Sequence, residues 1–170
     1  NVSFQTMVTA MRLMWGDEKT KEWLRGIQAN GPKLFPKNTP IVAAAASGEI
    51  DVGFVNHYYL LRALQENTQF PASNFHTRNG DPGALMMVSG VGILASSENQ
   101  DAALKLVEFL LSEVGQQYFA SQTFEYPVVQ GVTTNPALVP LSEIDAPAIK
   151  LRELADLEGT LDLLRDAGVL

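Results

Sequence analysis

The chain contains no cysteine among its 170 residues. It therefore has no disulfide, no thiolate metal site and no cysteine nucleophile. The absence is compatible with the cytosol and with many exported bacterial proteins, so it leaves the redox compartment open. The sequence has only two histidines and contains neither a G-x-S-x-G nor an H-E-x-x-H motif, so it offers few groups for an enzyme active site. We therefore expect a protein that is not an enzyme.

Basic residues are scarce. Lysine and arginine together number 12 against 19 acidic residues, which gives a formal net charge of −7. A nucleic-acid surface needs clustered positive charge to neutralise phosphates, so no nucleic-acid partner is expected. With 46% hydrophobic residues the chain can build a core, and its length fits one ordinary domain or one lobe plus part of another.

No long hydrophobic run is present. The most apolar stretch, residues 84–95, is interrupted by Ser89, Gly90 and Gly92 and is too short to span a bilayer. Residues 1–5 lack an initiating methionine, a basic segment and a cleavage site, so no signal peptide is visible. We interpret the chain as a piece of a longer protein.

Periodic segments alternate along the sequence. Near-continuous apolar runs at 50–55 and 85–94 are typical of parallel strands buried on both faces. Ser3 is a good N-cap for a helix that reaches Trp15, and Gly16 is a good stop. Strands that alternate with helices predict an α/β fold with a largely parallel sheet flanked by helices. Further helices are expected over residues 17–29, 39–47, 58–66, 99–111, 112–119 and 161–167.

Two adjacent tyrosines, Tyr58 and Tyr59, follow the predicted strand 50–55 at the point where a helix begins. Buried phenols need polar partners, so a pair at this position is costly if only packing is at stake. In open α/β sheets ligands bind beyond the carboxyl ends of strands. A phenolate is a hard oxygen donor, and a trivalent cation displaces its proton at neutral pH. These residues are therefore candidate ligands of ferric iron.

Three stretches resemble the ferric-ion-binding receptors of bacterial iron ABC importers. They are Ser3-Phe4-Gln5, the run from Glu49 through Asn56-His57-Tyr58-Tyr59 to Leu60, and the run from Phe109 to Val128 that contains Gln116-Gln117-Tyr118-Phe119 and Glu125-Tyr126-Pro127-Val128. The resemblance extends over the whole chain. It implies a bilobal, type II periplasmic-binding-protein-like fold, of which this chain is mainly the second lobe.

The resemblance also implies roles for individual residues. Tyr58 and Tyr59 would bind Fe³⁺, and Ser3, Asn38 and Asn56 would hold a synergistic anion such as phosphate or carbonate. The helix that begins near Ser3 supports an anion independently, because free N–H groups and the helix dipole favour negative charge. The implied partner is a membrane permease, and the implied location is periplasmic or extracytoplasmic. First-lobe ligands would lie before Asn1.

The resemblance divides the chain into three parts. Residues 1–87 would form the second-lobe core, 88–138 would cross over to complete the first lobe, and 139–170 would return to the second lobe. In an isolated fragment the crossover would lack sheet partners and leave apolar surface exposed, which favours dimerisation or strand exchange.

Other interpretations remain open at this stage. The same fold serves receptors for polyamines, sugars, phosphonates or thiamine-like molecules, on which the tyrosines would stack, and it also serves ligand-sensing domains of regulators. One phenol could instead pack against the helix while the other lies at the surface. His57 directly precedes Tyr58, and we expect it to make a structural hydrogen bond beside the ligands rather than bind the metal.

Overall fold

The structure is a computed structural model that describes residues 1–170. Helices and extended connections make up the chain, and no residue lies in a strand. No helix combines the length and the apolar character needed to cross a membrane. The helices are α1 (Val2–Trp15), α2 (Asp17–Ala29), α3 (Asn38–Ala46), α4 (Tyr58–Glu66), α5 (Gln100–Leu110), α6 (Glu113–Tyr118) and α7 (Leu157–Asp166), with short 3₁₀ turns at Pro82–Ala84, Leu141–Glu143 and Leu151–Ala155 and a π turn at Phe119–Thr123.

The predicted parallel sheet is wrong for this chain. Residues 50–55 and 85–94 are extended, but neither segment pairs with another. A strand requires a neighbour that accepts and donates backbone hydrogen bonds, and here the neighbours of segment 50–55 are helices. Phe54 packs against Phe4 of α1 and Trp23 of α2, with ring centroids 5.7 and 5.8 Å apart. The segment thus contacts helices through Phe54 without forming a sheet, although Phe54 itself stays 45% exposed.

Most helix ends follow the predicted signals. Gly16 ends α1 with φ of 81°, a conformation that glycine adopts without steric cost, and Ser112 caps α6 by accepting a hydrogen bond from Gly115. The cap of α1 is a correction. Asn1, not Ser3, is the N-cap, and its side-chain oxygen accepts a hydrogen bond of 2.9 Å from the Ser3 N–H. Asparagine is as good an N-cap as serine, so the helix begins earlier than predicted.

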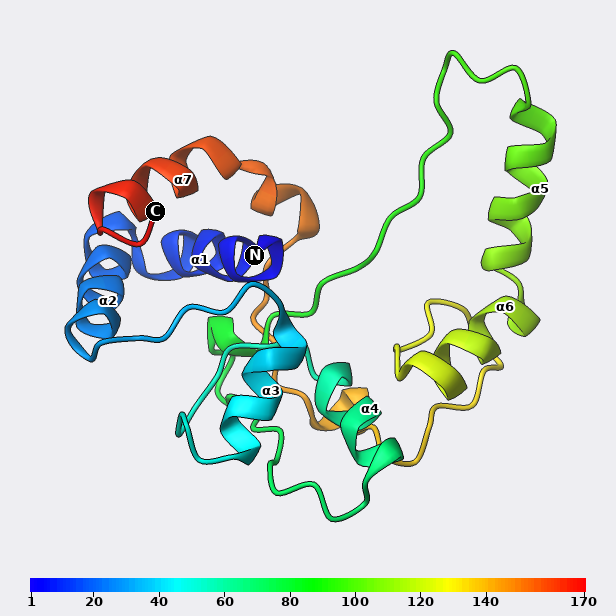
Figure 1. The fold of residues 1–170 in the computed structure, drawn as a ribbon. Coiled ribbons are helices and arrows are strands. Elements are labelled where there is room, and N and C mark those ends of the chain that lie inside the picture. The colour runs from blue at the N-terminus through cyan, green and yellow to red at the C-terminus, as the bar shows by residue number, and fades with distance from the viewer.

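The main core lies where α1, α2 and α7 meet (Figure 1). A buried polar contact ties the two ends of the chain together within it, because the Thr9 and Thr160 hydroxyls are 2.7 Å apart. Beside it Arg12 donates to Asp17 and Asp156 at 2.8 and 2.9 Å. The helices thus form one body. Its fully packed residues are Val8, Met11, Leu24, Leu163, Leu164 and Ala167.

Residues 85–138 form an arm that runs away from this body and carries α5 and α6 (green to yellow in Figure 1). No residue of α5 is buried. The whole chain exposes 11378 Å². A folded monomer of this mass would expose about 8,200 Å², so roughly 3,000 Å² is in excess, comparable to a large obligate interface. Dimerisation or strand exchange through this surface stays a prediction. Its exposed apolar residues include Leu104, Leu106, Phe109, Leu111 and Val114.

The far end of the arm returns to pack against α4. Leu61 of α4 forms a small buried cluster with Phe124 and Leu138 of the arm. Tyr58 of α4 and Tyr126 of the arm both pack against this cluster. The helix that begins with the tyrosine pair is thus fixed by the arm, and the pair lies between the body and the arm.

Candidate metal centre at Tyr58 and Tyr59

The tyrosine pair opens α4 directly after the extended segment 50–55. Gly53 passes so close to α3 that a Cβ atom there would clash with the Ile41 side chain, and this contact limits the path of the segment. Asn56 and His57 follow, and α4 begins at Tyr58. Residues of the first helical turn have no intrahelical partner for their N–H groups, so this end of α4 favours an anionic oxygen.

The two phenol rings lie side by side. Their centroids are 4.7 Å apart and their planes differ by 36°. Both residues are half-buried, so each ring packs on protein while part of it meets solvent. The Asn56 side-chain amide donates a hydrogen bond of 3.0 Å to the Tyr58 hydroxyl. The two phenols thus share one environment instead of one being packed and the other lying at the surface, and their role as iron ligands stays a prediction.

The surroundings of Tyr58 favour its protonated form. Burial is the largest effect and raises the pKa of Tyr58 above its ordinary value of 10.0. The Asn56 hydrogen bond opposes this by lowering that pKa, whereas the Tyr59 side chain and the Glu125 carboxylate raise it further. Above the rings lies Arg62, with its guanidinium carbon 5.0 Å from the Tyr58 centroid and 5.9 Å from that of Tyr59. Because burial raises the pKa of Tyr58, its phenolate form is disfavoured unless a cation compensates the charge.

The three predicted anion-binding residues fall into two groups. Asn38 begins α3, is 9% exposed, and accepts a hydrogen bond of 2.9 Å from the Asn1 amide. Ser3 belongs to the same group, because Asn1 also accepts from its N–H. Asn56 instead bonds Tyr58, and no hydrogen bond joins the two groups. The prediction that all three hold one anion stays a prediction.

His57 makes the structural hydrogen bond expected of it. Its Nε2 lies 2.8 Å from the Phe124 carbonyl oxygen, to which it donates. Its ring also lies 5.5 Å from that of Tyr58 and 5.3 Å from that of Tyr126. The sequence analysis missed Phe124 and Glu125 as neighbours of the site. Their one signal is that they directly precede Tyr126 in the last stretch of the resemblance.

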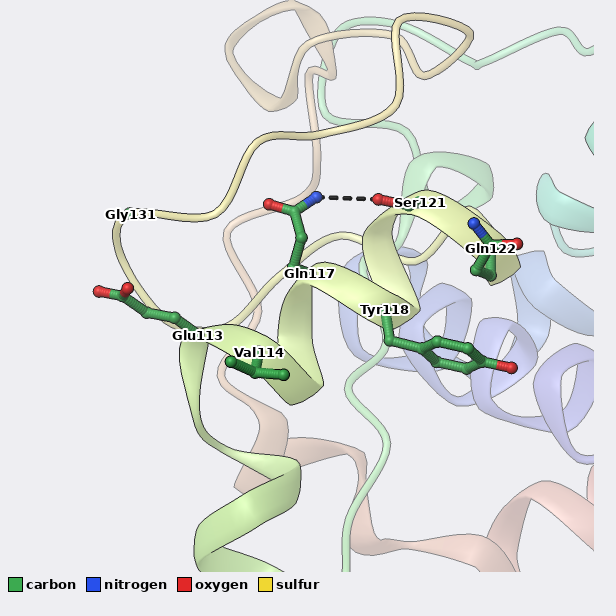
Figure 2. A pocket seen from close by; sticks show the side chains of 7 residues that line it. All are labelled: Glu113, Val114, Gln117, Tyr118, Ser121, Gln122 and Gly131. Atoms are coloured by element: carbon green, nitrogen blue, oxygen red, sulfur yellow. Dashed lines mark hydrogen bonds between the residues drawn. The ribbon is translucent and has the colours of Figure 1, made fainter.

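One hollow lies away from the tyrosine pair. About 520 Å³ of open space on the arm is lined by Glu113, Val114, Gln117, Tyr118, Ser121, Gln122 and Gly131 (Figure 2). Gln117, one of the lining residues, donates hydrogen bonds to Ser121 and to the Thr133 carbonyl oxygen. The chain also has no group of three or more His, Cys, Asp or Glu residues placed to bind a metal. The tyrosine pair remains the candidate centre.

Comparison with known proteins places this geometry in a family. The family model described as "Bacterial extracellular solute-binding protein" matches residues 1–151. The major ferric iron-binding protein of Neisseria meningitidis (serogroup A) is 33% identical over 172 residues, covering 98% of this chain and 51% of the relative. The Fe(3+)-binding periplasmic protein of Serratia marcescens is 31% identical and covers 98% of this chain and 50% of the relative. The chain belongs to the family of bacterial extracellular solute-binding proteins.

Solved structures agree with this assignment. Iron-bound HitA from Pseudomonas aeruginosa superimposes with a TM-score of 0.92 at 34% identity, covering 99% of this chain and 55% of HitA. Apo ferric ion-binding protein A from Pasteurella haemolytica gives a TM-score of 0.82 at 26% identity, covering 99% of this chain and 55% of that protein. The backbone path of the chain is thus that of periplasmic iron-binding proteins. The chain spans about half the length of these relatives.

Proposed function

We propose that this chain is the tyrosine-bearing half of an extracytoplasmic receptor that binds Fe³⁺ and delivers it to an ABC importer. The observation that carries the proposal is the pair Tyr58 and Tyr59, half-buried with centroids 4.7 Å apart at the N-terminus of α4. Its support is the naming of relatives as ferric iron-binding proteins and the superposition on iron-bound HitA. These relatives favour iron over the other solutes that the fold can bind.

In this proposal the two phenolates are ligands, and the cargo ion supplies the charge that keeps them deprotonated. Ser3, Asn38 and Asn56 hold a synergistic anion that fills part of the remaining coordination. The N-terminal end of α1, which Asn1 caps at the Ser3 N–H, supports this role because the helix dipole attracts negative charge. Ligands from the other half of the receptor complete the shell when the two lobes close.

The proposed division of the chain follows its shape. Residues 1–87 and 139–170 supply the body that carries α1, α2, α3, α4 and α7. Residues 88–138 supply most of the arm, whose exposed apolar surface would be covered by the first lobe of the complete receptor. The closed, iron-bound form would then be presented to the membrane permease.

Proton release on iron binding tests the ligand assignment. Burial raises the pKa of Tyr58 above the value of about 10 of an unperturbed tyrosine, and in this proposal iron binding replaces one proton on each of the two phenols. Displacement of two protons makes their contribution to iron affinity rise about 100-fold per pH unit. We expect Tyr58→Phe and Tyr59→Phe each to release about one proton fewer per iron than the complete wild-type receptor. Indicator-dye titration in weak buffer with a ferric chelate measures this. Unchanged release in both variants contradicts the assignment.

A further inference from the structure

The contact between α4 and the arm is more specific than hydrophobic packing requires. His57 is the residue before the first helical residue of α4, and its Nε2 donates to the Phe124 carbonyl oxygen at 2.8 Å. Its own carbonyl oxygen accepts a hydrogen bond of 2.9 Å from the Asn74 side chain. His57 is therefore fixed at both its backbone and its ring. Because Tyr58 follows it directly, these two bonds set where the first turn of α4 begins.

Phe124 is held in a conformation that a phenylalanine rarely adopts. Its φ and ψ are 58° and 35°, in the left-handed region, where the Cβ atom of a non-glycine residue comes too close to the following carbonyl oxygen. Its side chain is only 4% exposed and packs against Leu61 and Leu138. This buried packing and the His57 bond keep the residue there. Left-handed non-glycine residues that are held by their surroundings often occur at functional sites.

The same segment reaches the tyrosine pair through His57. The Tyr126 ring lies 5.3 Å from the His57 ring, and the Tyr126 hydroxyl donates to the Val139 carbonyl oxygen at 2.6 Å. His57 in turn meets the Tyr58 ring edge-on, with centroids 5.5 Å apart and planes at 80°. A continuous chain of contacts thus runs from the end of the arm through one imidazole to a proposed iron ligand.

We propose that His57 is a positioning residue that couples the arm to the ligand Tyr58 through its hydrogen bond to the Phe124 carbonyl. This inference rests on the proposed ferric-iron function. His57 contacts no metal in this account. It holds the start of α4 at a fixed place relative to residues 124–126, so the direction of the Tyr58 hydroxyl depends on the arm. Without this bond Tyr58 is still present, but its hydroxyl can turn away from the ion.

Two amide substitutions separate the hydrogen bond from the ring. In His57→Gln the side-chain nitrogen falls near the position of the imidazole Nε2 and can still donate to Phe124. In His57→Asn the amide is one carbon shorter and does not reach it. His57→Phe keeps the ring contacts and removes the donor. The three variants are made in the complete receptor, loaded with Fe³⁺ from ferric citrate, and challenged with excess chelator while iron loss is followed in the visible range.

Groups that orient metal ligands typically contribute 10- to 100-fold in affinity. We expect His57→Asn and His57→Phe to release iron about 10- to 100-fold faster than wild type with a shifted absorption maximum, and His57→Gln to restore both values. Three results overturn the inference. They are a wild-type rate of iron release in His57→Asn, a rate in His57→Gln as fast as that in His57→Asn, and a change in unfolding temperature with no change in iron release. Absence of iron binding by wild type overturns the proposed function itself, so the two failures are distinguishable.

Discussion

Replacing either Tyr58 or Tyr59 by phenylalanine lowers the affinity of the complete receptor for Fe³⁺ by more than about 100-fold, because each change removes a ligand rather than a group that orients one. Packing changes little, since phenylalanine keeps the ring and both rings are half-buried. The ion then keeps only one phenolate from this half of the receptor. Competition against a chelator of known ferric affinity measures the loss for each variant and for the double variant.

Tyr118→Phe is the matched control. This tyrosine lies on α6 of the arm, is 62% exposed, and contacts Phe119 rather than the tyrosine pair. Its loss should leave iron affinity unchanged. An equal loss in Tyr118→Phe and Tyr58→Phe would show that removal of any phenol disturbs binding indirectly, and the ligand assignment would fail.

The second large effect is on stability. Leu164 is 1% exposed in the core between α1, α2 and α7, so Leu164→Ala leaves a cavity and costs about 2–5 kcal/mol of unfolding free energy. That is a large share of the 5–15 kcal/mol by which a typical domain is stable. Urea unfolding followed by circular dichroism measures the difference. Leu157→Ala, on the same helix but 49% exposed, is the control and should change stability by less than about 0.5 kcal/mol.

A loss in Leu157→Ala as large as that in Leu164→Ala would contradict the assignment of the core. The comparison also tests how the site is supported. α1 is part of this core, and Phe4 of α1 packs against Phe54, three residues before His57. We therefore expect Leu164→Ala to reduce the free energy of iron binding by less than it reduces the free energy of unfolding, because the proposed ligands are unchanged.

Local signals in the sequence predicted the helices well. The caps and stops at Gly16, Asn99 and Ser112 depend on residues that are neighbours in sequence, so they are readable without the fold. The prediction that α4 begins at Tyr58 is confirmed for the same reason. The earlier start of α1 was missed because asparagine and serine are equally good N-caps, and the choice of Asn1 is coupled to its bond with Asn38.

The sheet could not be predicted correctly from the same signals. Apolar runs at 50–55 and 85–94 show that these residues favour burial, but pairing depends on a neighbouring strand that a local pattern does not reveal. The contacts around His57 have the same origin. Phe124 lies 67 residues from His57. Its left-handed backbone could not be predicted, because the position is not occupied by glycine. Long-range contacts of this kind are set by the fold as a whole.

The most direct test of the central claim is the visible absorption of the complete receptor loaded with Fe³⁺. Phenolate bound to ferric iron gives a charge-transfer band that neither partner has alone, so the band reports the bond itself. We predict that the wild-type receptor shows this band and that the Tyr58→Phe, Tyr59→Phe double variant lacks it at any iron concentration. A band of undiminished intensity in the double variant would contradict the account, because other residues would then bind the iron.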